Sequence, residues 1–153
     1  MNKLNNILVI NGPNLNLLGD REPSIYGNLK LKDIEHSLIE LGKSNLYEVS
    51  CIQSNYEGEL IEAIQNASRS YSGIIINAGG YSHTSIALMD ALKSYSKPII
   101  EVHMSNIYAR EKFRHESYIS RVASGCICGF GALGYELAVY SIIKLLEQKI
   151  NKY

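Results

Sequence analysis

An α/β fold built on a parallel β-sheet is the architecture that this sequence predicts. Five short apolar runs alternate with segments whose apolar residues recur every three to four positions, and short loops join them. The clearest runs, ILVI and GIIIN, are continuous and β-branched, which is typical of parallel strands buried on both faces. At 153 residues, the chain is expected to form one domain over residues 1–153.

The strands are predicted where an apolar run meets a turn signal. The first run, ILVI, ends at Asn11 and Gly12, and the third, GIIIN, is followed by the turn AGGYS. The five predicted strands cover residues 7–10, 47–52, 73–77, 98–103 and 124–128.

Helices are predicted between these strands. In the first, apolar residues recur at helical spacing from Leu31 to Leu41, and Gly42 is expected to be its C-cap. The second has acidic residues in its first turn, as the helix dipole favours. A polar, charged stretch that ends near residue 121 precedes the fifth strand. The predicted helices cover about residues 31–41, 54–71, 83–95 and 135–150.

This alternation limits the topology, because crossovers between parallel strands are right-handed. The favoured arrangement is a flavodoxin-like three-layer fold with the strand order 2-1-3-4-5. In that order the chain leaves the neighbouring first and third strands in opposite directions, so ligands are expected over their carboxyl ends. The loops after the first, third and fourth strands should therefore line a crevice.

The charge balance excludes several classes of partner. The chain has 15 basic and 15 acidic residues and no basic block, which argues against binding to nucleic acid or to a membrane surface. No segment approaches the length of about 18 apolar residues that a membrane span needs. Cys51, Cys126 and Cys128 form no CxxC pair and lie in apolar segments. We therefore expect a cytoplasmic protein.

The loop over residues 11–27, NGPNLNLLGDREPSIYG, is the expected centre of function. Long loops without periodicity in compact domains are usually functional or disordered, and this one is too rich in Leu, Ile and Tyr for a flexible linker. A surface Ω-loop packed by its own leucines is the alternative.

The predicted crevice carries acid–base and amide groups. Glu101 and His103 are two positions apart on one strand and so share a face, where the carboxylate could hold the imidazole in one tautomer. A structural histidine paired with a core glutamate is the alternative. The polar candidates are Asn14, Arg21, Tyr26, Asn77, His83, Glu101, His103, Ser105, Arg110 and Arg114.

Arg21 and Tyr26 form the more specific pair. A tyrosine titrates near 10, and a nearby guanidinium lowers the pKa of an acid by about 1 to 3 units. Arg21 with a second cation such as Arg114 could therefore make Tyr26 a base at neutral pH. The alternative is that Tyr26 only packs, as most of the 11 tyrosines are expected to do.

Other chemistries fit the motifs poorly. GFGALG comes after the last strand and out of frame for a dinucleotide loop, and Ser105 lacks a GxSxG elbow. The loops also lack the groups expected for a flavin phosphate or for a receiver domain. The histidines have no HExxH or facial-triad spacing, so no metal site is predicted; they are His36, His83, His103 and His115.

Four colinear motifs resemble those of the type II 3-dehydroquinate dehydratases. They are NGPNLNLLGDREPSIYG, SNYEGELI, INAGGYSHTSIALMDAL and EVHMSNIYAREKFRHESYIS, and together they cover nearly the whole chain. The resemblance implies a flavodoxin-like fold, a dodecamer, no cofactor, and conversion of 3-dehydroquinate to 3-dehydroshikimate in the shikimate or quinate pathway.

The resemblance also implies roles for single residues. Tyr26 would remove the C2 proton with activation by Arg21, Asn14 would help to hold a water that stabilises the enolate, and His103, oriented by Glu101, would protonate the leaving hydroxyl. The implied substrate-binding residues are Asn77, His83, Asp90, Met104, Ser105 and Arg114, with Asp90 reaching a neighbouring subunit's site.

Two positions depart from the family pattern. Ala78 stands where proline is usual, and Ser24 where an acidic residue is common. Neither replaces a catalytic group. The alternative function is a flavodoxin-like protein that binds a small carboxylate without chemistry, which would not need the set of Arg21, Tyr26, Glu101 and His103.

Overall fold

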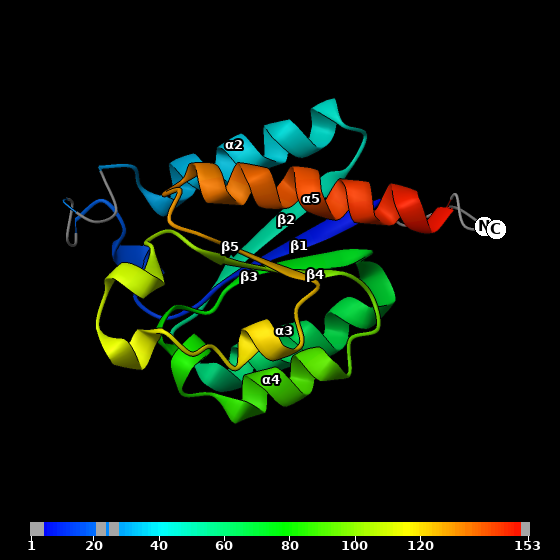
Figure 1. Cartoon of the computed structure of the whole chain (residues 1–153). Helices are drawn as coiled ribbons and strands as arrows, with labels where there is room; N and C mark the ends of the chain where they lie inside the picture. The colour runs from blue at the N-terminus through cyan, green and yellow to red at the C-terminus, as the bar shows by residue number, and fades with distance from the viewer. Residues whose placement is uncertain (1–4, 21–23, 25–27, 151–153) are drawn as a thin grey trace.

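The computed structural model describes residues 5–20, 24 and 28–150, and within them five parallel strands form one sheet. The strand order is β2-β1-β3-β4-β5, as predicted (Figure 1). The strands are β1 (Asn6–Asn11), β2 (Glu48–Gln53), β3 (Gly73–Asn77), β4 (Ile99–His103) and β5 (Gly125–Cys128).

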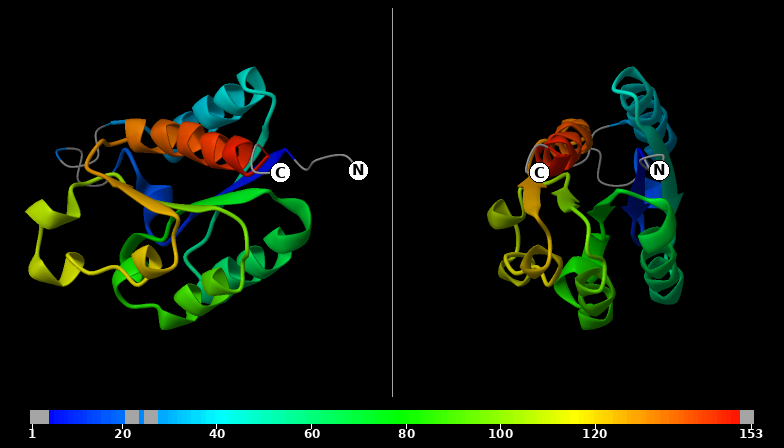
Figure 2. Two further views of the ribbon diagram at one scale, coloured as in Figure 1. Left: turned by 45° about the vertical axis from the view of Figure 1, so that its right-hand side comes forward. Right: turned by 90° about the vertical axis from the view of Figure 1, so that its right-hand side faces the viewer.

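Two pairs of helices cover the two faces of the sheet. In both views of Figure 2, α2 and α5 lie on the side opposite to α3 and α4. The helices are α2 (Leu31–Ser44), α3 (Glu57–Ser70), α4 (Ile86–Lys93) and α5 (Leu133–Ile150). Among the described residues, no helix is both long and apolar enough to cross a membrane.

Alternating strand residues divide the core in two. Ile7 and Val9 of β1 belong to the cluster under α2 and α5, while Leu8 and Ile10 belong to the cluster under α3 and α4. All four are at most 3% exposed. Burial on both faces explains why the strand sequence is continuously apolar.

The loops after β1, β3 and β4 gather at one end of the sheet (Figure 1). Short 3₁₀ helices shape them, and the predicted polar stretch before β5 contains three of these. They are η1 (Leu15–Leu17), η2 (Gly79–His83), η3 (Ile107–Ala109), η4 (Lys112–Arg114) and η5 (Ile119–Arg121).

Two predicted helix boundaries were wrong. Gly42 is not a C-cap, because α2 continues to Ser44; a Cβ at Gly42 would lie only 2.5 Å from Val49 Cγ2, so glycine serves packing against β2. The third helix begins at Ile86, not near His83. Ser85 is its N-cap, since its Oγ accepts a hydrogen bond from Leu88 N at 2.9 Å.

Candidate active site

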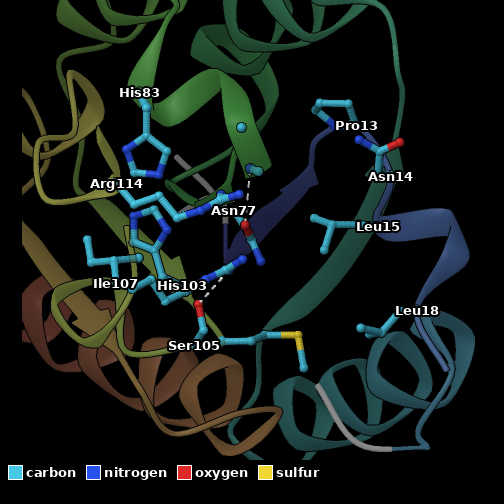
Figure 3. A pocket seen from close by; sticks show the side chains of 14 residues that line it. Pro13, Asn14, Leu15, Leu18, Asn77, His83, His103, Ser105, Ile107 and Arg114 are labelled. Atoms are coloured by element: carbon cyan, nitrogen blue, oxygen red, sulfur yellow. Dashed lines mark hydrogen bonds between the residues drawn. The ribbon is translucent and has the colours of Figure 1, made fainter. Parts of the chain in front are cut away.

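A cavity of about 160 Å³ lies at the carboxyl ends of the strands, where the topology predicted a crevice. Figure 3 shows the loop after β1 on one side, the segment after β4 on the other, and Asn77 of β3 between them. The lining residues are Pro13, Asn14, Leu15, Leu18, Asn77, Gly79, Gly80, His83, His103, Met104, Ser105, Ile107, Arg110 and Arg114.

Glu101 and His103 form the buried pair that their spacing predicted. His103 Nε2 lies 2.7 Å from Glu101 Oε1, and the side chains are 6% and 0% exposed. Ser117 and Ser120 also donate hydrogen bonds to the Glu101 carboxylate. Burial alone would raise the pKa of Glu101, but the hydrogen bonds and charge of His103 and the two serine hydroxyls outweigh it and hold that pKa below its usual value.

An ionised Glu101 fixes the orientation of the imidazole. The carboxylate accepts a hydrogen bond from Nε2–H of His103, which leaves Nδ1 as the ring nitrogen available to a ligand in the cavity. The pair therefore has the geometry of an oriented acid or base whose imidazole lines the crevice.

His83 stacks beside His103, with ring centroids 5.9 Å apart and planes at 21°. Its Nδ1 lies 2.6 Å from the carbonyl oxygen of Glu116, so Nδ1 carries the proton and Nε2 is an acceptor. Burial is the main reason that the pKa of His83 is below its ordinary value. His83 is thus suited to accept a hydrogen bond as a neutral imidazole.

The ends of β1 and β3 are joined through a buried tyrosine. Asn77 Nδ2 donates to Tyr135 Oη at 2.9 Å, and Tyr135 Oη donates to Asn11 Oδ1 at 2.7 Å. Gly79 N donates to Asn77 Oδ1 at 3.2 Å, which fixes the amide orientation. Burial raises the pKa of Tyr135, so its hydroxyl stays protonated.

Tyr135 was missed at the sequence level. It was counted only as the start of a helix, and nothing in the sequence pairs it with strands β1 and β3. Its role depends on α5 crossing the sheet under their carboxyl ends, a contact between segments 58 and 124 residues apart.

The loop after β1 is held close to the loop after β3. Gly12 N donates to Asn77 O at 2.8 Å, and a Cβ at Gly12 would lie 2.3 Å from Ala78 O. Only glycine permits this approach. Asn14 then adopts a left-handed conformation with φ 68°, which asparagine tolerates, and its N–H donates to Asn55 Oδ1 at 3.0 Å.

Two arginines bring positive charge to the cavity from the segment after β4. Arg110 Nη1 donates to Ser105 Oγ at 3.2 Å, and Arg114 Nε donates to Glu111 Oε2 at 2.9 Å. Arg110 was recognised as a crevice residue but given no role, and its contact with Ser105 supplies one. A small anion is the ligand that such a wall favours.

Not every predicted site residue is found at the cavity. Asp90 is exposed on α4 and does not line it. Arg21 and Tyr26 lie outside the described residues. The other predicted residues converge as expected: Asn14, Asn77, His83, His103, Met104, Ser105 and Arg114 line the cavity, with Glu101 beneath His103.

The fold and the site define a class: a flavodoxin-like α/β protein whose crevice combines an oriented histidine with amide and guanidinium donors. The chain belongs to one family within it, since the family model described as dehydroquinase class II matches residues 5–143.

Relatives and solved structures agree with this assignment. The 3-dehydroquinate dehydratase of Prochlorococcus marinus (strain NATL1A) is 54% identical over 142 residues, which are 93% of this chain and 98% of that protein. A type II dehydroquinase from Butyrivibrio crossotus superimposes with a TM-score of 0.89 at 48% identity, covering 90% of this chain and 97% of that one. One from Propionibacterium acnes also gives 0.89, at 43% identity and 92% and 97% coverage.

Proposed function

We propose that this protein catalyses the dehydration of 3-dehydroquinate to 3-dehydroshikimate, in the shikimate or quinate pathway. The observation that carries the proposal is the buried Glu101–His103 pair beneath the crevice of a chain in this family. A protein that only binds a carboxylate would not need an acid–base pair, so the binding-module alternative is not favoured. The reaction removes water without a change in redox state, and the proposed mechanism needs no cofactor.

Proton removal is the first step. Tyr26, as a phenolate stabilised by the Arg21 guanidinium, takes the proton from C2, next to the substrate's carbonyl group. The electrons of the broken C–H bond move into an enolate. Asn14 helps to hold a water molecule that donates a hydrogen bond to the developing negative charge.

Loss of the hydroxyl is the second step. The enolate re-forms the ketone, a double bond forms between C1 and C2, and the C1–O bond breaks. His103, protonated on Nδ1, donates that proton to the departing oxygen, so that water leaves. Glu101 stabilises the imidazolium through Nε2–H, at 2.7 Å, and keeps the ring turned toward the substrate.

The remaining cavity residues bind the substrate. Ser105, held by Arg110 at 3.2 Å, takes the carboxylate together with the backbone at Met104. Asn77, His83 and Arg114 bind the hydroxyl groups. The neutral His83 described above supplies an acceptor, and Arg114 supplies a charged donor.

The proposal includes a homo-oligomer, a dodecamer by family resemblance. Asp90 is exposed on α4 and away from its own cavity, which is the placement that a residue serving a neighbouring subunit requires. The chain would then have a reason to assemble with closed symmetry.

The test is the ultraviolet absorbance of the enone product after 3-dehydroquinate is added. The wild-type protein should form product, and Tyr26→Phe should lose most turnover while keeping its fold and substrate affinity, because phenylalanine preserves the ring but cannot accept a proton. Turnover of the variant within tenfold of wild type would show that Tyr26 is not the base. No turnover by the wild type would overturn the proposed function.

A further inference from the structure

A cysteine from the neighbouring strand lies beside the Glu101–His103 pair. In the register between β4 and β5, Glu101 pairs with Cys126 and His103 with Cys128. Because β5 is an edge strand, its side chains have no further strand beside them, and Cys126 is exposed. The proposed reaction uses neither cysteine.

The three side chains make a set of metal ligands. Glu101, His103 and Cys126 each offer one ligand atom, and these atoms lie within 4.8 Å of one another. Carboxylate, imidazole and thiolate are the three groups that bind Zn²⁺ in proteins, with bonds of about 2.0 to 2.3 Å. Ligand atoms around such an ion are roughly 3.3 to 3.8 Å apart, so side-chain movements of about an ångström would close the site.

The surroundings also suit a metal ion. Ser117 and Ser120 donate hydrogen bonds to the Glu101 carboxylate and so hold this ligand in place, as outer groups do in metal sites. The exposed side of Cys126 gives an ion a path from solvent and leaves a fourth position for water.

We propose that Glu101, His103 and Cys126 form a binding site for a thiophilic divalent cation such as Zn²⁺, and that the bound cation switches the acid–base pair off. The site differs from the catalytic use of the pair, because it adds Cys126 and replaces a proton by a metal ion.

The chemistry of inhibition follows from the hydrogen bond within the pair. His103 Nε2 now shares a proton with Glu101 across 2.7 Å. A cation between them binds the Nε2 lone pair and the carboxylate oxygen. The Nε2 proton leaves to solvent, Nδ1 takes up a proton from solvent so that the ring stays neutral, and the thiol proton of Cys126 passes to solvent. The metal then neutralises Glu101, and because Nε2 is occupied, His103 can no longer become an imidazolium. The neutral metal-bound ring keeps a proton on Nδ1 but is a much weaker acid than the imidazolium that the proposed reaction needs.

The spacing of the three ligands along the sequence does not reveal this site. Cys126 is 23 positions after His103 and reaches it only through the pairing of β4 with β5. The histidine spacing therefore predicted no metal site, although a neighbouring strand supplies the third ligand.

Binding is tested first with Cd²⁺ and without substrate. Titration of the wild-type protein should produce the ultraviolet charge-transfer band of a Cd²⁺–thiolate bond with one ion per chain. Cys126→Ser should lose the band, and Cys128→Ser, the matched control two positions away on the same strand, should keep it. No band in the wild type, or loss of the band only with Cys128→Ser, would overturn the proposal. This measurement does not depend on the proposed function.

Inhibition is tested with Zn²⁺ in the dehydratase assay and rests on the proposed function. Zn²⁺ should inhibit the wild type and EDTA should restore it. Cys126→Ser and Cys126→Ala should keep basal activity and need at least about tenfold more Zn²⁺ for half-inhibition, since a ligand is lost. Equal sensitivity of wild type and both Cys126 variants would contradict the switch.

Discussion

Two cavities lie at opposite ends of the sheet, and the larger one is not where reactive groups gather. The crevice at the carboxyl ends has about 160 Å³, whereas the cavity before β4 and β5 has about 310 Å³. The larger cavity is lined by a cation and a phenol, Lys97 and Tyr95, which are the kinds of group that the proposed mechanism assigns to Arg21 and Tyr26. Neither the volume of a cavity nor the kinds of side chain that line it therefore identify the catalytic end by themselves.

The difference lies in how the polar groups are occupied. Lys97 Nζ donates to the carbonyl oxygens of Ser68 at 2.8 Å and Tyr71 at 2.5 Å, and Tyr95 Oη donates to Tyr71 O at 3.0 Å. Lys97 and Tyr95 thereby provide hydrogen-bond donors to the carbonyl oxygens at the carboxyl end of α3. Burial raises the pKa of Tyr95, which removes it as a base.

In the crevice, by contrast, internal contacts orient polar groups and leave part of each available. His103 gives one nitrogen to Glu101 and keeps the other for a ligand. The functional end of a sheet is thus recognised by polar side chains that internal hydrogen bonds hold in one orientation, while other hydrogen-bonding atoms of the same side chains stay available to a ligand. The variants below remove groups at one end or the other.

The largest effect is expected from His103→Ala. Loss of a positioned acid should lower kcat by about 100- to 10,000-fold. The measurement is steady-state turnover of 3-dehydroquinate beside Lys97→Met, which should keep the wild-type kcat. If the two variants lost activity equally, the assignment of the chemistry to the carboxyl end would be wrong.

The next effect is expected from Glu101→Gln, which keeps the shape but not the charge. The variant should lower kcat with little change in KM, because an amide stabilises an imidazolium poorly.

Glu101→Gln should also change acid stability. The folded-state pKa of Glu101 is below its unfolded value, so its contribution is present above the unfolded pKa, about 4.3, and is lost as pH falls through the folded pKa. Denaturant unfolding of the variant at a series of acidic pH values should show a free energy of unfolding that lacks this pH-dependent contribution of Glu101. An identical acid profile in variant and wild type would contradict the account.

A smaller effect is expected from Tyr135→Phe. Removing the hydroxyl leaves the buried Asn77 Nδ2 and Asn11 Oδ1 without their shared partner, at about 1 to 3 kcal/mol in the free energy of unfolding. Because Asn77 also loses its anchor at the crevice, KM should rise more than kcat falls. A variant that is less stable but has an unchanged KM would show that Tyr135 contributes to stability and does not position Asn77 for substrate binding.

Lys97→Met should affect stability alone. The substitution removes two charge-assisted hydrogen bonds to carbonyl oxygens at the end of α3 but keeps an apolar stem, so the loss is expected to be about 1 to 2 kcal/mol. Chemical denaturation measures it, and unchanged kcat and KM serve as the control. A changed KM would show that the larger cavity takes part in binding.

The fold could be predicted because its signals are local. Continuous β-branched runs and helical spacing predicted the strands and helices, and their alternation with right-handed crossovers favoured the strand order. The i, i+2 spacing of Glu101 and His103 placed both on one face. Gly42 was wrongly predicted to be a C-cap because the contact that requires glycine there is made with Val49, which lies on another element. Tyr135 and Cys126 reach the site only through tertiary packing. The roles of Arg21 and Tyr26 remain predictions from the motif.

The measurement that tests the central claim most directly is borohydride trapping during turnover. If the lysine-bearing cavity carried the chemistry, an imine on Lys97 would be the expected intermediate, whereas a tyrosine base and a histidine acid at the carboxyl end form no bond to the substrate. We predict full activity and an unchanged protein mass after borohydride is added with 3-dehydroquinate. A substrate-sized adduct on Lys97 or any other lysine, with matching inactivation, would contradict the account.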